Sequence, residues 1–279
     1  MKLLFFGDVF GRPGREALKK ELPNLKTKYN PDIVIANVEN IAHGSGITAK
    51  TLEELDAPGI IDGYTLGDHA WDTPEASTIL ENMKHIVRPA NFSGDNPGSG
   101  HAVIEGGGYR VLIVNLLGYI FGINENGDSY LKHEIDNPFV ALDDILKNYS
   151  MGADNENKDR IDAIFVDIHA EFTSEKRALG FYADGRVSAV VGTHTHVPSY
   201  DAQILEGGTA YLTDAGMTGP ANSVIGLDKD SIVKQYATGE KQKTDVSNET
   251  KVEIGAVLVS VGKNGLAESV EQIRNIVDL

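Results

Sequence analysis

The sequence predicts an α/β protein in which a sheet or a pair of sheets is enclosed by helices. Short, continuously apolar runs, typical of strands that are covered on both faces, alternate with amphipathic helical stretches. Glycine-rich turns between some of these runs add antiparallel hairpins to the parallel βα units. Because no internal repeat or convincing linker divides the chain, we expect one domain over residues 1–279.

The elements follow from these patterns in chain order. The expected strands are residues 2–6, 32–38, 110–117, 162–168, 187–192 and 255–261. The expected helices are residues 14–28, 49–55, 74–83, 138–149 and 174–182. The third helix has a start signal, a Thr73 hydroxyl before a proline at the first helical position. Hairpins are expected around residues 105–108 and 206–208, and loops over residues 151–160 and 228–250.

Composition excludes several classes of function. The chain carries a net charge of −16, which disfavours stable binding to nucleic acids or membranes because a surface this acidic repels phosphate and anionic lipid. The lack of cysteine rules out disulfides, thiolate nucleophiles and cysteine-ligated zinc or iron–sulfur sites, so we expect a metal site to use His, Asp, Glu and Asn. With no signal-like or membrane-spanning apolar segment, we expect a cytoplasmic location.

Polar side chains of the metal-binding type follow the ends of five expected strands, four of those listed above and a further one that ends at Leu66. Since ligands bind beyond the carboxyl ends of strands in α/β sheets, these side chains should converge on one edge. Grouped carboxylates repel one another unless a cation lies between them, so the set predicts a metal centre. The candidates are Asp8, Glu39, Asn40, Asp68, His69, His169, His194 and His196. Taken alone, Asp8 could be a helix cap and Asn40 a turn residue. Of His194 and His196, one could be only a hydrogen-bonding partner.

The other distinctive residues have less context. His43, in a glycine-rich loop after Asn40, could face the substrate, and Trp71 is expected to pack beside the site, with base stacking as the alternative. Surface or packing positions are expected for His85, His101 and His133. The signatures of serine hydrolases, P-loop NTPases, dinucleotide enzymes and zincins are missing. A His-rich set of oxygen and nitrogen ligands favours a transition metal such as iron, manganese or zinc.

An ordered set of motifs from residue 7 to about residue 227 resembles the YmdB-like branch of the calcineurin-type metallophosphoesterases. The motifs are Gly7-Asp8-Val9-Phe10-Gly11, Asn37-Val38-Glu39-Asn40, Gly67-Asp68-His69-Ala70-Trp71-Asp72, Asp167-Ile168-His169-Ala170-Glu171, Gly192-Thr193-His194-Thr195-His196-Val197 and Thr213-Asp214-Ala215-Gly216-Met217-Thr218-Gly219-Pro220. The resemblance implies an α/β fold in which two mixed β-sheets pack as a sandwich flanked by helices.

The resemblance also implies two divalent or mixed-valence metal ions per chain, with iron favoured and manganese or zinc as alternatives. Asp8, Glu39, Asn40 and His196 would hold one ion, Glu39 would bridge to a second held by Asp68, His169 and His194, and His69 would be the proton donor. The chain departs from the family at Asp68, where the usual residue is Asn. This extra anion should hold its metal more strongly but withdraw less charge from a bound phosphate.

The predicted function is therefore that of a phosphodiesterase acting on cyclic nucleotides such as 2′,3′-cyclic AMP. A hydroxide supplied by the two metals would attack phosphorus, and His69 would protonate the departing alkoxide. One alternative is a phosphomonoesterase that acts on a nucleotide or sugar phosphate. Another is a regulatory protein that senses a nucleotide or metal and hydrolyses weakly. The expected partner is a small phosphate ester, and homo-oligomerisation is left open.

Overall fold

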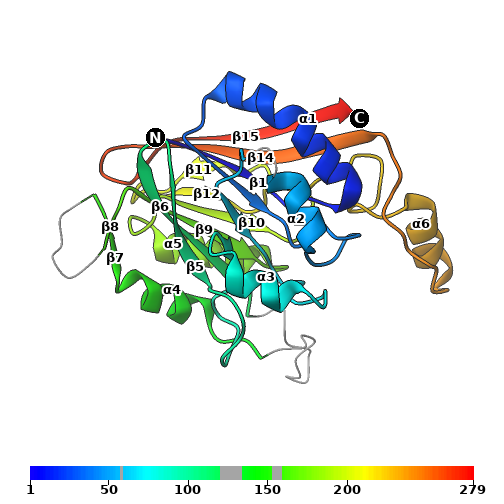
Figure 1. Cartoon of the computed structure of the whole chain (residues 1–279), viewed down its shortest axis with the longest axis horizontal. Coiled ribbons are helices and arrows are strands. Elements are labelled where there is room, and N and C mark those ends of the chain that lie inside the picture. The colour runs from blue at the N-terminus through cyan, green and yellow to red at the C-terminus, as the bar shows by residue number, and fades with distance from the viewer. Residues whose placement is uncertain (57–58, 120–133, 153–158) are drawn as a thin grey trace.

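The computed structural model describes residues 1–56, 59–119, 134–152 and 159–279, and within them two mixed sheets pack face to face (Figure 1). The first sheet has the order β13-β14-β1-β2-β3-β4, with β15 on the other side of β14. Its strands β1 to β4 are parallel, and β14 is antiparallel to β1, β13 and β15. Their bounds are β1 Lys2–Phe6, β2 Ile33–Asn37, β3 Gly63–Thr65, β4 Ile86–Val87, β13 Thr218–Pro220, β14 Lys251–Val261 and β15 Ala267–Asp278.

The second sheet has the order β11-β12-β10-β9-β6-β5. Strands β12, β10, β9 and β6 are parallel, and the edge strands β11 and β5 are antiparallel to their neighbours. The bounds are β5 His101–Gly106, β6 Tyr109–Leu117, β9 Ala163–His169, β10 Ala189–Thr193, β11 Gln203–Ile204 and β12 Ala210–Leu212. A separate parallel pair joins β7 Tyr149–Met151 to β8 Asp159–Ile161.

Helices cover the outer face of each sheet, so the sandwich has four layers. Side chains alternate along β1, and Phe5 therefore points between the sheets, where its ring lies 4.8 Å from that of Phe165, while Phe6 points toward the helices. The helices of the first sheet are α1 Gly11–Tyr29, α2 Ala49–Asp56 and α3 Ala76–Asn82, and those of the second are α4 Pro138–Leu146 and α5 Thr173–Ala183. The sandwich of two mixed sheets flanked by helices is confirmed. Among the described residues, no helix is both long and apolar enough to cross a membrane.

All six predicted strands, all five predicted helices and both hairpins are present, with shifted ends. The third helix begins at Ala76 and not at Pro74, because the Thr73 hydroxyl donates to the Ile47 carbonyl and caps no helix. The predicted loop over residues 228–250 was wrong in part. It contains α6 Lys229–Thr238, whose start is capped by the Asp228 carboxylate, 3.0 Å from the Ser231 amide nitrogen.

The predicted loop over residues 151–160 is only partly testable, since residues 153–158 lie outside the described residues, and its two ends belong to β7 and β8. The sequence reading also missed β15, the long partner of β14. One face of β15 is exposed, so its apolar residues are interrupted by charged ones and do not form the continuous run that marks the buried strands.

Candidate metal centre

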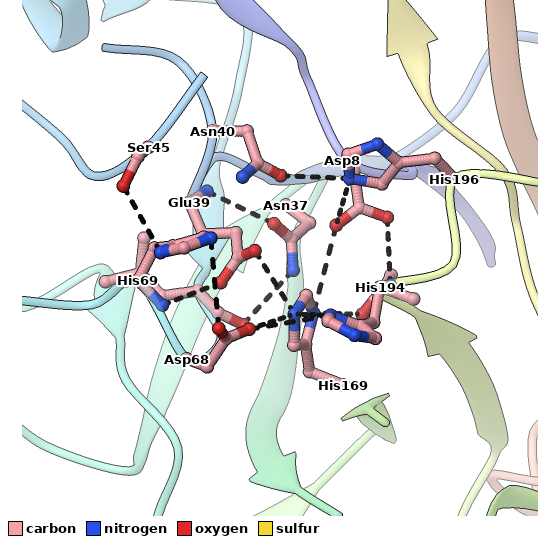
Figure 2. A network of polar contacts seen from close by, with 12 residues as sticks. Asp8, Asn37, Glu39, Asn40, Ser45, Asp68, His69, His169, His194 and His196 are labelled. Carbon is pink, nitrogen blue, oxygen red and sulfur yellow. Dashed lines mark hydrogen bonds and ion pairs between the residues drawn. The ribbon is translucent and has the colours of Figure 1, made fainter. Parts of the chain in front are cut away.

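The carboxyl ends of parallel strands from both sheets meet in one polar cluster (Figure 2). Asp8 follows β1, Glu39 follows β2, Asp68 follows β3, His169 ends β9 and His194 follows β10. Each of the eight predicted residues contacts at least one other member of the set, namely Asp8, Glu39, Asn40, Asp68, His69, His169, His194 and His196. The convergence expected from the strand ends is thus present in the structure.

Four of these side chains form a compact group of ligand atoms. One atom each from Glu39, Asp68, His169 and His194 lies within 4.8 Å of all the others. At the centre of the group, Nε2 of His169 is 3.1 Å from Asp68 Oδ1, 3.2 Å from Glu39 Oε1 and 3.0 Å from His194 Nδ1. Two carboxylate oxygens and two imidazole nitrogens that converge in this way are a donor set suited to a transition metal.

A second group lies beside the first. Nε2 of His196 is 3.2 Å from Asn40 Oδ1 and 3.9 Å from Asp8 Oδ1. Asp8 is fully buried, and its Oδ1 has no hydrogen-bond partner. A buried carboxylate oxygen without a partner is costly, so this atom needs a counter-charge. A cation between Asp8, Asn40 and His196 would supply it, and these residues therefore fit a second metal ion.

Buried groups behind His169 fix which of its nitrogens faces the cluster. The Thr193 hydroxyl donates to Asp167 Oδ1 at 2.6 Å, so it accepts from His169 Nδ1, which lies 2.9 Å away. Nε2 therefore faces Asp68 and Glu39, and in the neutral ring its lone pair is directed toward them, as a metal ligand requires. Asp167 also accepts hydrogen bonds from Asn37 and Thr65, and burial raises the pKa of its carboxyl to about 6.

None of these supporting residues was predicted to have a role. For Asn37 and Asp167 the sequence does carry a usable signal, because each is a polar residue inside a continuously apolar strand. Thr65 and Thr193 carried no such signal, because threonine is a common strand residue.

His69 sits at the edge of the cluster with its side chain 35% exposed. Its Nδ1 is 2.7 Å from Asp72 Oδ2, and the Ser45 hydroxyl donates to the same carboxylate oxygen at 2.6 Å. Its other nitrogen, Nε2, faces the Asp68 carboxylate at 3.8 Å. One side of the ring is thus held by a carboxylate, while the other borders the presumed metal ligands.

Comparison with known proteins identifies the family. A model of the YmdB-like protein family matches residues 4–273. The chain belongs to the YmdB-like family. It is 41% identical to a 2′,3′-cyclic-nucleotide 2′-phosphodiesterase of Bacillus subtilis (strain 168), over 94% of this chain and 91% of that protein. The family resemblance predicted from the motifs is confirmed.

Solved structures agree with this assignment to the YmdB-like family. A Thermus thermophilus protein described as hypothetical superposes with a TM-score of 0.84 at 37% identity, over 99% of each chain. A phosphatase from Mycoplasma pneumoniae superposes with a TM-score of 0.86 at 35% identity, over 100% of this chain and 94% of that one. The whole sandwich is therefore shared with these proteins.

In this YmdB-like site, concentrated negative charge controls the proton affinities. Burial lowers the pKa of His169, but the carboxylates of Glu39, Asp68 and Asp8 outweigh burial and bring the pKa well above its usual value. Burial raises the pKa of the Asp68 carboxyl, but hydrogen bonds from His169 and His194 outweigh this and leave it far below its usual range. The field that holds a proton on His169 would equally attract a metal cation.

The same field acts on His69. Burial lowers its pKa, whereas the carboxylates of Glu39, Asp68 and Asp72 raise it, and the net effect is an increase. An imidazole that keeps its proton near neutral pH can act as a general acid.

Gly67 leaves the space that the ligands occupy. A Cβ atom at this position would overlap the Glu39 carboxylate and the His169 ring. The glycine directly before Asp68 is therefore required by packing, because any side chain there would push two presumed ligands apart.

The remaining predicted residues lie outside the cluster. His43 is exposed and lines a separate cavity of about 590 Å³ with Arg12, Arg15 and Lys19, so its role toward a substrate stays a prediction. Trp71 packs edge-on against Phe92, with ring centroids 4.7 Å apart. Two of the histidines without an assigned role, His85 and His101, are partly buried away from the cluster, and His133 lies outside the described residues.

Proposed function

We propose that this protein is a dinuclear metal-dependent phosphodiesterase that hydrolyses cyclic nucleotides such as 2′,3′-cyclic AMP. The observation that carries the proposal is the group of converging ligand atoms from Glu39, Asp68, His169 and His194, with the buried Asp8 Oδ1, which has no hydrogen-bond partner, beside it. Support for the substrate class comes from the Bacillus subtilis relative, which is named as a 2′,3′-cyclic-nucleotide 2′-phosphodiesterase. Residues 1–279 would act as one metallophosphoesterase domain, because both sheets contribute side chains to the cluster.

The two groups of donors would hold two ions. Asp8, Asn40 and His196 would hold one, Asp68, His169 and His194 the other, and Glu39 would bridge them. Two observations support the bridging role: Glu39 directly precedes Asn40 in the sequence, and its Oε1 lies 3.2 Å from Nε2 of His169. We propose iron as the metal, with manganese or zinc as alternatives, since imidazole and carboxylate ligands without sulfur suit all three.

When bound, the metal ions would supply a nucleophilic hydroxide at neutral pH and neutralise charge on the phosphoryl oxygens. A side chain of the protein would protonate the leaving group. As the bond from phosphorus to the ribose oxygen breaks, the departing alkoxide needs a proton, and Nε2 of His69 would donate it. Asp72 holds the opposite nitrogen of the ring and stabilises the imidazolium before transfer. Water provides the group that replaces the ribose oxygen on phosphorus.

The test is a substrate panel run on protein of measured metal content. Purified protein, loaded with iron, manganese or zinc, would be assayed with 2′,3′-cyclic AMP, a linear dinucleotide, nucleoside monophosphates and sugar phosphates. We expect ring opening of the cyclic nucleotide to have the highest kcat/KM. A preference for monoesters would favour a phosphomonoesterase, and tight nucleotide binding with negligible turnover would favour a sensor. A chain that binds no metal and is inactive with every metal would contradict the proposal.

Two further predictions accompany this function. A cytoplasmic location is proposed from the sequence, and the expected partner is a small nucleotide-like phosphate ester. The net charge of −16 makes nucleic-acid and membrane binding poor candidates.

A further inference from the structure

The segment that carries His194 and His196 has an unusual backbone. Both residues have positive φ angles, 95° and 63°, in the left-handed region that side chains with a Cβ rarely adopt. The conformation directs Nδ1 of His194 toward His169 and Nε2 of His196 toward Asn40. Strained conformations of this kind persist only where the surroundings fix them. Some part of the structure must therefore hold the segment in place.

The Asp214 carboxylate holds the residue between the two histidines. Its Oδ2 accepts from the Thr195 hydroxyl at 2.7 Å and lies 3.3 Å from the Thr195 amide nitrogen. Its Oδ1 accepts from the Gly216 amide at 2.9 Å, which fixes the orientation of the carboxylate. Asp214 is 2% exposed, so these are contacts of a buried anion.

Lys176 of α5 binds both the Asp214 carboxylate and the backbone that precedes His194. Its ammonium donates to Asp214 Oδ2 and to the Thr193 carbonyl, each at 2.6 Å. The side chain is fully buried and packs closely against Gly192, where a Cβ would lie 2.8 Å from Lys176 Cδ. The Lys176 ammonium group thus links the Thr193 carbonyl, directly before His194, to the Asp214 carboxylate, which binds Thr195 directly after it.

We propose that Lys176 and Asp214 are positioning residues for metal binding, an inference that rests on the metal centre of the proposed function. Neither belongs to the compact group of ligand atoms formed by Glu39, Asp68, His169 and His194. Their contacts reach Thr193 and Thr195, which flank His194 on both sides and lead into His196. Because His194 faces one group of donors and His196 the other, this buried ion pair contributes to the geometry of both metal positions, together with the Asp8 carboxylate, which accepts from the His194 amide.

The proposal makes a specific claim about Lys176→Met. Methionine has a similar length but carries no charge and no donor. The Asp214 carboxylate therefore loses its cation, and the Thr193 carbonyl loses its hydrogen bond from Lys176. Changes to groups that orient metal ligands reduce metal affinity by roughly 10- to 100-fold. We expect Mn²⁺ to bind the metal-free variant roughly 10-fold or more weakly at both positions.

A second variant tests the proposal even if Lys176→Met does not fold. Thr195→Val removes only the hydroxyl that donates to Asp214 and leaves the ion pair intact. It should weaken Mn²⁺ binding in the same direction by a smaller factor. Arg186→Met is the matched control, because it also replaces one cation by methionine but at a surface pair with Asp143 whose side chains are 39% and 37% exposed. The control should bind Mn²⁺ like the wild type.

Titration calorimetry with MnCl₂ gives the affinity and number of ions, and electron paramagnetic resonance of the loaded protein reports whether two Mn²⁺ ions are close enough to couple. Weaker binding and loss of the coupled signal in Lys176→Met, with weaker binding in Thr195→Val, would support the proposal. A lower melting temperature with unchanged Mn²⁺ affinity and coupling would overturn it, since the pair would then stabilise the fold only. If wild-type protein itself binds no Mn²⁺, the proposed function fails and the inference falls with it.

Discussion

Replacing Asp72 with Asn isolates the charge beside the presumed proton donor. Asp72 Oδ2 lies 2.7 Å from Nδ1 of His69, and the pKa of His69 is raised by neighbouring carboxylates, of which Asp72 is one. Asparagine has nearly the same shape and keeps a carbonyl oxygen that can accept from Nδ1, so the ring should stay in place. What changes is the stabilisation of the protonated ring. His69 should therefore lose its proton at lower pH in the variant.

The size of the change follows from the contact. A hydrogen bond to a charged group contributes about 1.5–3 kcal/mol and a neutral one about 0.5–1.5 kcal/mol, so the charge itself contributes roughly 1 to 1.5 kcal/mol. The two side chains are 35% and 22% exposed, and solvent screening reduces the difference to about 1 kcal/mol or less. Since one pKa unit corresponds to about 1.4 kcal/mol, we expect a decrease of roughly half a unit. Glu39 and Asp68 still raise the pKa of His69 in the variant.

The assay is the pH profile of kcat/KM for 2′,3′-cyclic AMP with Mn²⁺-loaded enzyme, from about pH 5 to pH 10. A general acid must be protonated, so activity falls as pH rises through its pKa, and a lower pKa moves this alkaline limb to lower pH. Ser45→Ala is the control, because it removes a neutral hydroxyl that contacts the same carboxylate and leaves the charge. An alkaline limb that does not move in Asp72→Asn, or moves equally in Ser45→Ala, would refute the reasoning.

Three further changes test the site. His69→Ala should keep its metal and lose roughly 10²- to 10⁴-fold in activity on cyclic nucleotides but much less on aryl esters, whose phenolate leaves without a proton; equal losses on both substrates would remove His69 as the donor. Asp68→Asn should alter turnover or preference among iron, manganese and zinc more than it alters the melting temperature, and unchanged kinetics with all three would show that Asp68 is not a ligand. Because carboxylates raise the pKa of His169, a proton competes with the metal for this ring. The Mn²⁺ affinity of metal-free protein should therefore rise with pH, and Mn²⁺ binding should release protons, which calorimetry in buffers of different ionisation enthalpy measures. A pH-independent affinity would contradict this expectation.

The strands were predictable, but their division between two sheets was not. The apolar runs that became β1 and β2 look the same in sequence as those that became β6 and β9, because all four strands are covered on both faces. Which sheet a buried strand joins depends on long-range pairing that local pattern does not encode. The resemblance to a known family, and not periodicity, supplied the sandwich.

The candidate ligands were predictable because strand ends place them together whatever the sheet order. Their supports depend on contacts between elements far apart in the sequence. Ser45 reaches Asp72 across 27 residues, and Asn37 reaches Asp167 across 130. A serine in a glycine-rich loop or an asparagine in a strand has many ordinary explanations, and only the folded chain shows which one applies.

The pairing of β1 affects when the proposed metal centre can assemble during synthesis of the chain. This strand leads to Asp8, yet one of its two neighbours, β14, is formed by residues Lys251–Val261 near the other end of the chain. The Asp8 carboxylate also accepts from the His194 amide, across 186 residues. A ribosome adds about 5–20 residues per second, so the nascent chain spends many seconds with Asp8, Glu39 and Asp68 made and His194 and His196 still missing. The proposed metal centre can therefore assemble only after His194, His196 and the β14 strand beside β1 have been made.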